Sequence, residues 1–456
     1  MAAIDGRIPG SLTLRFVYSL LIRCAVPAAL TALLWRGFTD RSYWQGLGQR
    51  LGFGSSLREP RIWLHAVSLG EMSAAAPLLR ALRLRYPQLP LVVTSATPAG
   101  RARAQALFPN DADIRFLPYD TPGSVRRFLA RIQPRAAIIM ETELWPNLLR
   151  ACERRGVPVL LASARLSDRS VARYRRFGTL FSGVFTTNLL VAAQTSGDAE
   201  RFGAIGAAAA QIRVTGNVKF DLELDAGVVQ AGQALRTKLG APRPVWIAGS
   251  THAGEDEQVL DAHASLLRLR PDALLILVPR HRDRFADVAD LLRRRGIEFA
   301  RRSEMMGSEM MGGETMGGET MGGEMTRGID APRARAAPVL LGDTVGELAL
   351  LYACADAAFV GGSLVAVGGH NLLEPAALGL PVLTGPSYGN SKEIAQLLLA
   401  RGAALQVGSA SELAVVLERL LADPLERRRI GAIGQEIVAS NRGSVERLLA
   451  LIEPKA

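Results

Sequence analysis

Short runs rich in Val, Ile and Leu recur along this chain, and stretches with the pattern of amphipathic helices lie between most of them. A first set extends from RIWLHAV at 61–67 to LLVAAQTS at 189–196. A second set extends from PVWIAGST at 244–251 to PVLTGP at 381–386. Strands that are apolar on both faces and alternate with helices are typical of a doubly wound parallel sheet. The sequence therefore predicts two α/β domains in tandem, joined near residues 222–243.

The size and charge of the chain agree with this organisation and narrow the possible partners. Its 456 residues are too many for one ordinary core and fit two domains. The 54 Lys and Arg against 43 Asp and Glu give a formal net charge of +11, which favours nucleic acid, anionic lipid or phosphorylated substrates. The three cysteines and five histidines are scattered, so neither a zinc site nor a disulfide framework is predicted, and a reducing cytoplasm is the default location.

The amino-terminal stretch 11–35 is mostly apolar but carries Arg15 and Arg23. A spanning helix needs about 20 apolar residues, and a central arginine costs roughly 2.5–3.5 kcal/mol. No cleavage site between small residues is evident. The sequence favours an uncleaved anchor that either spans the membrane once or lies in its interface with snorkelling arginines. The alternative is a buried first helix of the globular fold.

The segment 303–326 breaks the α/β pattern by repeating an MGGET unit. Its glycine density and its lack of apolar periodicity predict a disordered surface insertion in the second domain. A methionine-rich metal site is disfavoured, because the repeat lacks the spacing of metal ligands.

Two glycine pairs, 361–362 and 368–369, follow a strand of the second domain. They allow backbone amides to approach a ligand closely and to point at phosphate. A helix is expected near Asn371, with its positive end toward the same ligand and Glu374 in its first turn. The alternative is a tight glycine turn in which Glu374 offsets the helix dipole. Two glycine pairs followed by HNLLEP favour the nucleotide site.

Two further features of the second domain are compatible with an anion site. Arg280 comes at the end of an apolar strand, where an arginine can bind phosphate or carboxylate through two hydrogen bonds. Thr344 and Glu347 have the spacing of a capping box, and the exposed amides of that helix start would also attract an anion.

Carboxylates follow two strands of the first domain. Glu71 comes after RIWLHAV, at the strand end where open α/β sheets place their chemistry, but Ser68 and Glu71 also have the capping-box spacing. Amide donors to a capping carboxylate would lower its pKa and make it a poor base. Glu141 and Glu143 follow another strand and would share one side of an extended chain, where they could bind a cation or an acceptor. Lys219 is a counter-charge for a leaving phosphate or, alternatively, a solvated lysine.

Seven motifs in this order resemble those of the bacterial 3-deoxy-D-manno-octulosonic acid (Kdo) transferases of lipid A assembly: HAVSLGE, METELWPN, ARLSDRS, TGNVKFD, VPRH, DTVGEL and GGHNLLEP. The resemblance covers the chain from the anchor to near residue 400, and only the MGGET insertion departs from it. It implies a GT-B glycosyltransferase fold, in which two Rossmann-like domains face a cleft. The expected parts are a membrane-anchoring helix at 1–40, an acceptor domain at 41–235 and a CMP-Kdo domain at 236–456.

The resemblance also implies an inverting transfer of Kdo from CMP-Kdo to the lipid A precursor (lipid IVA), without metal or cofactor. Glu71 would be the general base, and Glu141 and Lys219 would assist the transition state. The CMP part would be held by Pro279, Arg280, Val345, Gly346, Glu347, Asn371, Leu372, Leu373 and Glu374. The implied location is the cytoplasmic face of the inner membrane, with anionic lipids and no nucleic acid as partners.

Two other functions remain open at this point. A GT-B enzyme that uses a UDP-sugar would carry related phosphate loops. A non-catalytic basic protein of the membrane surface would fit the charge and the anchor, but it gives no reason for carboxylates at strand ends beside glycine loops.

Overall fold

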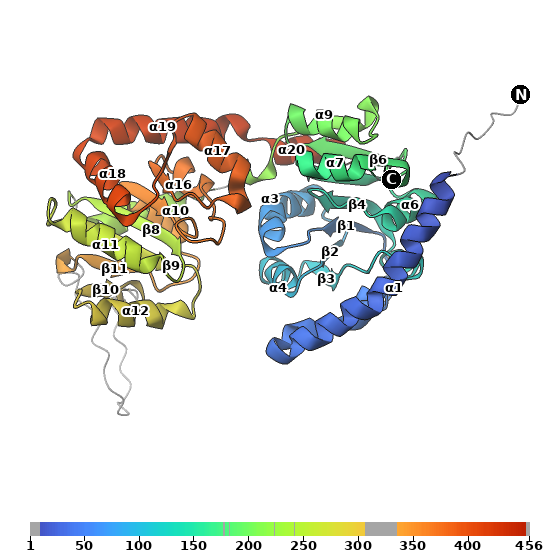
Figure 1. The fold of residues 1–456 in the computed structure, drawn as a ribbon, viewed down its shortest axis with the longest axis horizontal. Helices are drawn as coiled ribbons and strands as arrows, with labels where there is room; N and C mark the ends of the chain where they lie inside the picture. The colour runs from blue at the N-terminus through green and yellow to red at the C-terminus, as the bar shows by residue number, and fades with distance from the viewer. Residues whose placement is uncertain are drawn as a thin grey trace, which may run out of the picture. The chain divides into compact units, whose positions relative to one another are not determined.

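The computed structural model describes residues 10–176, 178–181, 183–222, 224–240, 242–305 and 335–452. The chain forms two compact units, and each has its own parallel sheet covered by helices (Figure 1). The first unit comprises Met1–Asp221 and Asn441–Ala456, and the second comprises Leu222–Ser440.

The first unit contains a seven-stranded sheet in the order β3-β2-β1-β4-β5-β6-β7, with every pairing parallel. Its strands are β1 (Arg61–His65), β2 (Leu91–Ser95), β3 (Ala112–Phe116), β4 (Pro134–Met140), β5 (Val159–Ala164), β6 (Leu189–Ala193) and β7 (Ile212–Val214). Alternate residues of β1 supply two cores: Trp63 packs with Phe128 on one face, and Leu64 packs with Leu78 on the other. Because both faces are covered, the central strands are apolar throughout.

The helices of the first unit connect these strands and cover both faces of the sheet. They are α1 (Gly10–Thr39), η1 (Arg41–Trp44), α2 (Leu47–Arg50), α3 (Leu69–Arg85), α4 (Pro98–Leu107), α5 (Pro122–Ile132), α6 (Pro146–Arg154), α7 (Asp168–Arg176), α8 (Gly178–Phe181), α9 (Ser196–Ala204), η2 (Ala209–Gln211), η3 (Val218–Phe220) and α20 (Ser444–Leu451). The strand order reverses between β1 and β4, so the sheet has its topological switch point there.

The second unit repeats this plan with the strand order β10-β11-β9-β8-β12-β13-β14, again parallel throughout. Its strands are β8 (Val245–Thr251), β9 (Leu274–Pro279), β10 (Phe299–Arg301), β11 (Val339–Leu341), β12 (Ala357–Val360), β13 (Val382–Thr384) and β14 (Ala404–Gln406). Its helices include α10 (Ala226–Lys238), α11 (Asp256–Leu267), α12 (Arg284–Arg294), α15 (Leu348–Ala353), α16 (Leu373–Ala377), η4 (Gly389–Ser391), α17 (Lys392–Ala400), α18 (Ala410–Ala422) and α19 (Pro424–Asn441). The switch point lies between β8 and β12.

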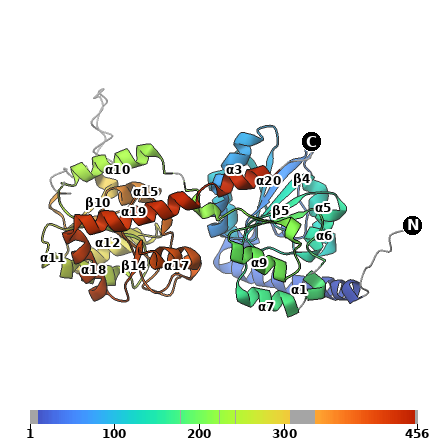
Figure 2. The ribbon, with the colours of Figure 1, turned by 90° about the horizontal axis from the view of Figure 1, so that it is seen from above.

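The division into units differs from the predicted boundary between residues 235 and 236. The helix α10 packs against α15, and Arg236 Nη2 lies 2.7 Å from Asp356 Oδ2, so the second unit begins near residue 222. The end of the chain, expected in the second domain, belongs to the first unit. There α20 lies beside α3 (Figure 2), Leu448 enters the core, and Tyr86 Oη donates to the carbonyl oxygen of Ile452 at 2.6 Å.

The helix α1 runs along one side of the first unit (Figure 1). Among the described residues, the Leu14–Thr39 part of α1 is the one helix long and apolar enough to cross a membrane, and none of its most apolar window is buried. Several of its large apolar side chains face outward, and Trp35 and Phe38 are 78% and 79% exposed. The alternative of a buried first helix was therefore wrong.

The part of the predicted MGGET insertion that begins at residue 306 lies outside the described residues.

Candidate functional site

Glu71 lies in the first turn of α3, the helix that follows β1 after a short loop. Ser68 is the N-cap residue, and its Oγ accepts a hydrogen bond from the Glu71 amide at 3.3 Å. The carboxylate reaches back: its Oε2 accepts from the Val67 amide at 2.8 Å, and its Oε1 accepts from Ser68 Oγ at 3.2 Å. The capping contact predicted from the Ser-x-x-Glu spacing is therefore present.

The pKa of Glu71 nevertheless moves in the direction opposite to that expected of a purely capping carboxylate. Burial raises the pKa, and the nearby charge of Glu141 raises it further. The Val67 amide, Ser68 and Lys219 act against this shift without cancelling it. A buried carboxylate with a raised pKa is a stronger proton acceptor than an exposed one, so capping and base chemistry are compatible at this position.

Glu141 is the first residue after β4 and has a φ of 55°, in the left-handed region that non-glycine residues rarely adopt. The sequence pattern predicts an extended chain at Glu141 and Glu143. The structure instead turns the chain at Glu141. Two cations hold the Glu141 carboxylate: Arg165 Nε donates to Oε2 at 2.9 Å, and Lys219 Nζ lies 3.7 Å from Oε1. Strained backbone that is held by several contacts is common at functional sites.

Lys219 lies in η3, which packs against α3. Its amide donates to Asn217 Oδ1 at 3.0 Å, and its side chain is 26% exposed and paired with Glu141. It is therefore not the solvated lysine of the alternative interpretation. The strand ends of β1 and β4 and the short helix η3 thus bring Glu71, Glu141 and Lys219 together at the switch point of the first sheet.

Glu143, which the sequence pattern grouped with Glu141 but to which the family resemblance gave no role, belongs to the same cluster. Burial raises its pKa to about 7, and the charges of Glu71 and Glu141 add to this effect. The signal in the sequence was the Glu-x-Glu pattern after a buried strand. Perturbed carboxyl groups that gather in this way mark candidate active sites.

The raised pKa of Glu143 makes stability depend on pH. Between its pKa of about 4.3 in the unfolded chain and about 7 in the fold, the unfolded chain releases a proton that the native protein keeps. Stability therefore falls as pH rises through this window and stays low above it. We expect Glu143→Gln to stabilise the protein by roughly 1–3 kcal/mol at about pH 8 and by much less at about pH 5 in urea unfolding.

Glu153→Gln is the matched control for that measurement, since Glu153 is an exposed carboxylate of the neighbouring helix α6. A stability change of Glu143→Gln that is the same at both pH values would contradict the assignment of a raised pKa.

In the second unit, Glu255 lies fully buried just after β8, at the N-cap position of α11. Its Oε1 accepts from the amides of Ser363 at 3.0 Å and Leu364 at 2.9 Å. Its Oε2 accepts from the amides of Gly362 at 2.6 Å and His252 at 3.2 Å. A carboxylate of the chain itself therefore fills the anion-binding position formed by these amides.

This arrangement corrects the prediction for the first glycine pair. The Gly362 amide was expected to face phosphate, but it donates to Glu255. Gly361 is needed for packing, because a Cβ there would lie 2.5 Å from the carbonyl oxygen of Ser250. The second pair, Gly368 and Gly369, has φ values of 102° and 69°, which favour glycine.

Three histidines far apart in the sequence meet beside the glycine loop. His252 Nε2 and His370 Nε2 are 2.7 Å apart with their rings stacked, and the ring of His281 lies edge-on to His252 at 5.5 Å. Burial, followed by the charge of Arg280, lowers the pKa of His370 to about 4. Burial also lowers the pKa of His252, so the pair is neutral near pH 7 and shares one hydrogen bond. No spacing in the sequence points to this cluster.

Arg280 directly follows β9, and it lies near Asn371 and Glu374, which stand at the start of α16. Asn371 Nδ2 donates to Glu374 Oε1 at 3.0 Å. Burial raises the pKa of Glu374, while Asn371 and Arg280 lower it. Helix α16 begins at Leu373, whose amide donates to Asn371 Oδ1 at 3.1 Å. Of the predicted nucleotide residues, Leu372 and Leu373 have fully buried side chains, so only their backbone can face a ligand.

The expected capping box at Thr344 and Glu347 does not form. Helix α15 begins at Leu348, so Glu347 is its N-cap residue, and no side chain caps it. The Glu347 carboxylate instead pairs with Arg302 through Nη2 at 2.8 Å and Nε at 3.1 Å and accepts from Thr344 Oγ1. Val345 is 75% exposed and Gly346 has a φ of 90°. This loop can therefore present backbone groups to a ligand, while the Glu347 side chain is occupied by Arg302.

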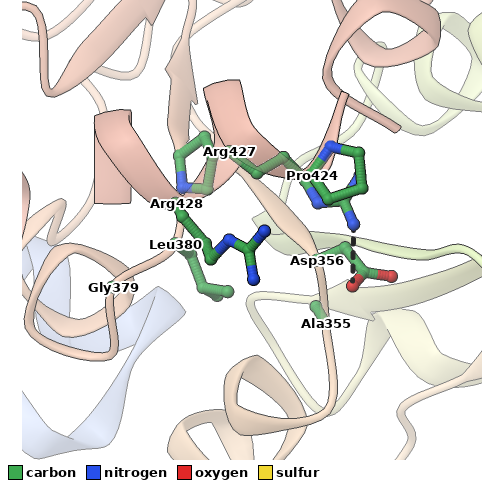
Figure 3. Close-up of a pocket in the computed structure, with 8 residues that line it drawn as sticks. Ala355, Asp356, Gly379, Leu380, Pro424, Arg427 and Arg428 are labelled. Atoms are coloured by element: carbon green, nitrogen blue, oxygen red, sulfur yellow. Dashed lines mark ion pairs between the residues drawn. The ribbon is translucent and has the colours of Figure 1, made fainter. Parts of the chain in front are cut away.

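A cavity of about 250 Å³ lies elsewhere in the second unit, lined by residues that include Asp356, Arg427 and Arg428 (Figure 3). Asp356 also accepts from Arg236 and from the Val245 amide, so it ties α10 and β8 to α19. None of the predicted nucleotide residues lines this cavity. Its contacts are those of a structural junction.

Comparisons with known proteins agree with the family resemblance seen in the motifs. The family model described as 3-Deoxy-D-manno-octulosonic-acid transferase (kdotransferase) matches residues 45–222, and the model of Glycosyl transferases group 1 matches residues 338–437. A 3-deoxy-D-manno-octulosonic acid transferase from Haemophilus influenzae is 39% identical over 444 residues, 96% of this chain and 98% of that protein. One from Bordetella pertussis is 36% identical over 452 residues, 96% of this chain and 99% of that protein.

Solved structures show the fold. UDP-GlcNAc 2-epimerase from Neisseria meningitidis matches with a TM-score of 0.52 and 15% identity, over 86% of this chain and 100% of that one. A glycosyltransferase from Rickettsia africae matches with a TM-score of 0.51 and 12% identity, over 87% of this chain and 98% of that one. The predicted α/β fold of the two-domain GT-B type is confirmed.

Proposed function

The chain belongs to the 3-deoxy-D-manno-octulosonic acid transferase family, and from this premise we propose that it moves Kdo from CMP-Kdo to a hydroxyl group of lipid IVA. The enzyme is a glycosyltransferase. The observation that carries the proposed chemistry is the cluster of Glu71, Glu141 and Lys219 at the switch point of the first sheet, with a raised pKa at Glu71.

Glu71 is the general base of the proposed reaction. It takes the proton of the acceptor hydroxyl as that oxygen attacks the anomeric carbon of Kdo from the face opposite the leaving group. The bond between the anomeric carbon and the phosphate oxygen breaks, and CMP leaves with the electron pair, so the anomeric configuration inverts. Lys219 offsets the negative charge that develops, and Glu141 holds Lys219 in place.

The second unit holds CMP in this proposal. Arg280 binds the phosphate, and the side chains of Asn371 and Glu374 form hydrogen bonds to the CMP part. Pro279, Val345 and Gly346 border the nucleotide. Leu372, Leu373 and Glu347 contribute backbone groups, because their side chains are buried or paired with Arg302. Catalysis without a metal stays a prediction.

The exposed apolar side chains of α1 support attachment to a membrane. We place the protein at the cytoplasmic face of the inner membrane, where its positive charge attracts anionic lipids.

The full-length protein incubated with lipid IVA and CMP-Kdo tests this function through the masses of the products. We expect products heavier by whole Kdo units, inhibition by CMP and no inhibition by UDP. Sugar transfer from a UDP-sugar instead would favour the other GT-B activity. No product with any of these donors would favour a non-catalytic membrane-surface protein.

A further inference from the structure

Beside α1 the first unit contains a cavity of about 520 Å³ that none of the predicted site residues lines. It lies between α1, α5 and α6. Six arginines line it, five from these helices and one, Arg155, from the position that follows α6. They are Arg15, Arg23, Arg126, Arg150, Arg154 and Arg155.

The cavity wall is held by specific contacts. Tyr18 Oη donates to Asp120 Oδ2 at 2.9 Å, and Ser19 Oγ donates to Asn147 Oδ1 at 3.1 Å. Asp120 is itself buried and also accepts from the amides of Asn147 and Leu148. The amino-terminal half of α1 is therefore fixed to the start of α6, and the Asp120 carboxylate is used in that attachment.

No carboxylate among the described residues balances the charge of these six guanidinium groups. Within the described part of the chain, none of them makes an ion pair, whereas Arg155 Nη2 donates to the carbonyl oxygen of Arg126 at 3.2 Å. Uncompensated positive charges around one cavity repel one another, and a bound anion relieves this repulsion. Guanidinium groups bind phosphate through pairs of hydrogen bonds, which gives such a site geometric preference as well as charge.

Apolar surface adjoins these charges. Phe16 and Leu20 line the same cavity from α1 and are 67% and 49% exposed. A soluble phosphate or a nucleic acid would leave this apolar surface in water, while a lipid covers it with acyl chain. We propose that this cavity binds the phosphate headgroup of an anionic phospholipid of the bilayer against which α1 lies. This inference rests on the membrane attachment in the proposed function.

Vesicle binding by the full-length protein tests the site. The vesicles are phosphatidylcholine alone or phosphatidylcholine mixed with phosphatidylglycerol, and the pocket variant is Arg126→Gln/Arg150→Gln/Arg154→Gln. Each basic residue near an anionic membrane adds to the free energy of binding. We therefore expect the pocket variant, which loses three of them, to bind the mixed vesicles about 100-fold more weakly. The control variant Arg268→Gln/Arg294→Gln/Arg429→Gln removes the same charge from exposed arginines of the second unit. We expect it to weaken binding by about three-fold or less.

A charge-preserving variant separates a built site from net charge. Arg126→Lys/Arg150→Lys/Arg154→Lys keeps all three charges and loses the forked geometry, so we expect about ten-fold weaker binding to the mixed vesicles. If the lysine variant binds the mixed vesicles as tightly as the native protein does, the proposal is overturned. Equal losses of binding in the pocket and control variants would also overturn it. So would unchanged binding of the pocket variant while its thermal unfolding shows an intact fold.

Two further measurements identify the source of the phosphate. Inorganic phosphate that displaces the protein from vesicles at low concentration would point to a soluble ligand instead. Kdo transfer to detergent-dispersed lipid IVA is expected to be unchanged in the pocket variant. A parallel loss of transfer would assign the cavity to the acceptor's phosphates. Failure of the native protein to prefer the mixed vesicles, with transfer intact, would overturn the lipid site and leave the proposed function standing.

Discussion

We expect Glu71→Gln to lower Kdo transfer by about 10²- to 10⁴-fold, because the variant lacks the group that takes the proton from the attacking hydroxyl. Its effect on folding should be small. The amide oxygen of glutamine still accepts from the Val67 amide, so the free energy of unfolding should fall by no more than about 1 kcal/mol. Initial rates with CMP-Kdo and lipid IVA, measured beside urea unfolding of the same preparation, check both parts.

The chain offers a matched control for the capping role. In α18 the Glu412 amide donates to Ser409 Oγ at 3.2 Å, and Glu412 Oε2 accepts from the Gly408 amide at 2.6 Å. These contacts match the ones that Glu71 makes with the Ser68 Oγ and the Val67 amide, but Glu412 is exposed and far from Glu71 in the sequence. Glu412→Gln should match the small stability change of Glu71→Gln and keep full transfer. A large stability loss in Glu71→Gln with residual turnover would leave Glu71 as a cap and not a base.

The second large effect is expected at Glu255. In Glu255→Gln the side-chain NH₂ group faces backbone amides that are themselves donors, and some of the four hydrogen bonds to buried amides are lost. We expect the second unit to be destabilised by about 3–5 kcal/mol. Because the same amides shape the glycine loop and position His252, CMP binding should weaken as well. Denaturant unfolding and calorimetric titration with CMP measure the two effects.

Asp261→Asn is the control for this substitution, since Asp261 is an exposed carboxylate of the same helix, α11. Its pair with Arg295 lies at the surface, where such pairs contribute about 0–1 kcal/mol. If Glu255→Gln unfolds at the same denaturant concentration as Asp261→Asn, Glu255 does not hold the loop.

Much of the fold could be predicted because its causes are local. Strands buried on both faces must be apolar along their whole length, and amphipathic helices must separate them when the sheet is parallel, so the alternation of runs indicated both sheets. The position of Glu71 after β1 and of Glu141 after β4 followed from the same pattern, since parallel strands end at one edge.

The remaining features depend on segments that are far apart in the chain. Glu255 meets amides more than 100 residues further on, and His252 meets His370, so no local spacing could indicate either contact. The return of the chain's end to the first unit is of the same kind, because α20 contributes Leu448 to a core made by α3. The balance of burial and charge that sets the pKa of Glu71 likewise requires the packed structure.

The amino-acid sequence by itself determined two parallel α/β units, an apolar amino-terminal helix and the strand ends that carry the carboxylates. Hydrophobic periodicity and strand direction are local properties, and both are written in neighbouring residues. Only the tertiary structure decided which amides a buried carboxylate occupies, which histidines touch and which arginines gather around one cavity. Those outcomes depend on contacts between distant segments, and no run of neighbouring residues encodes them.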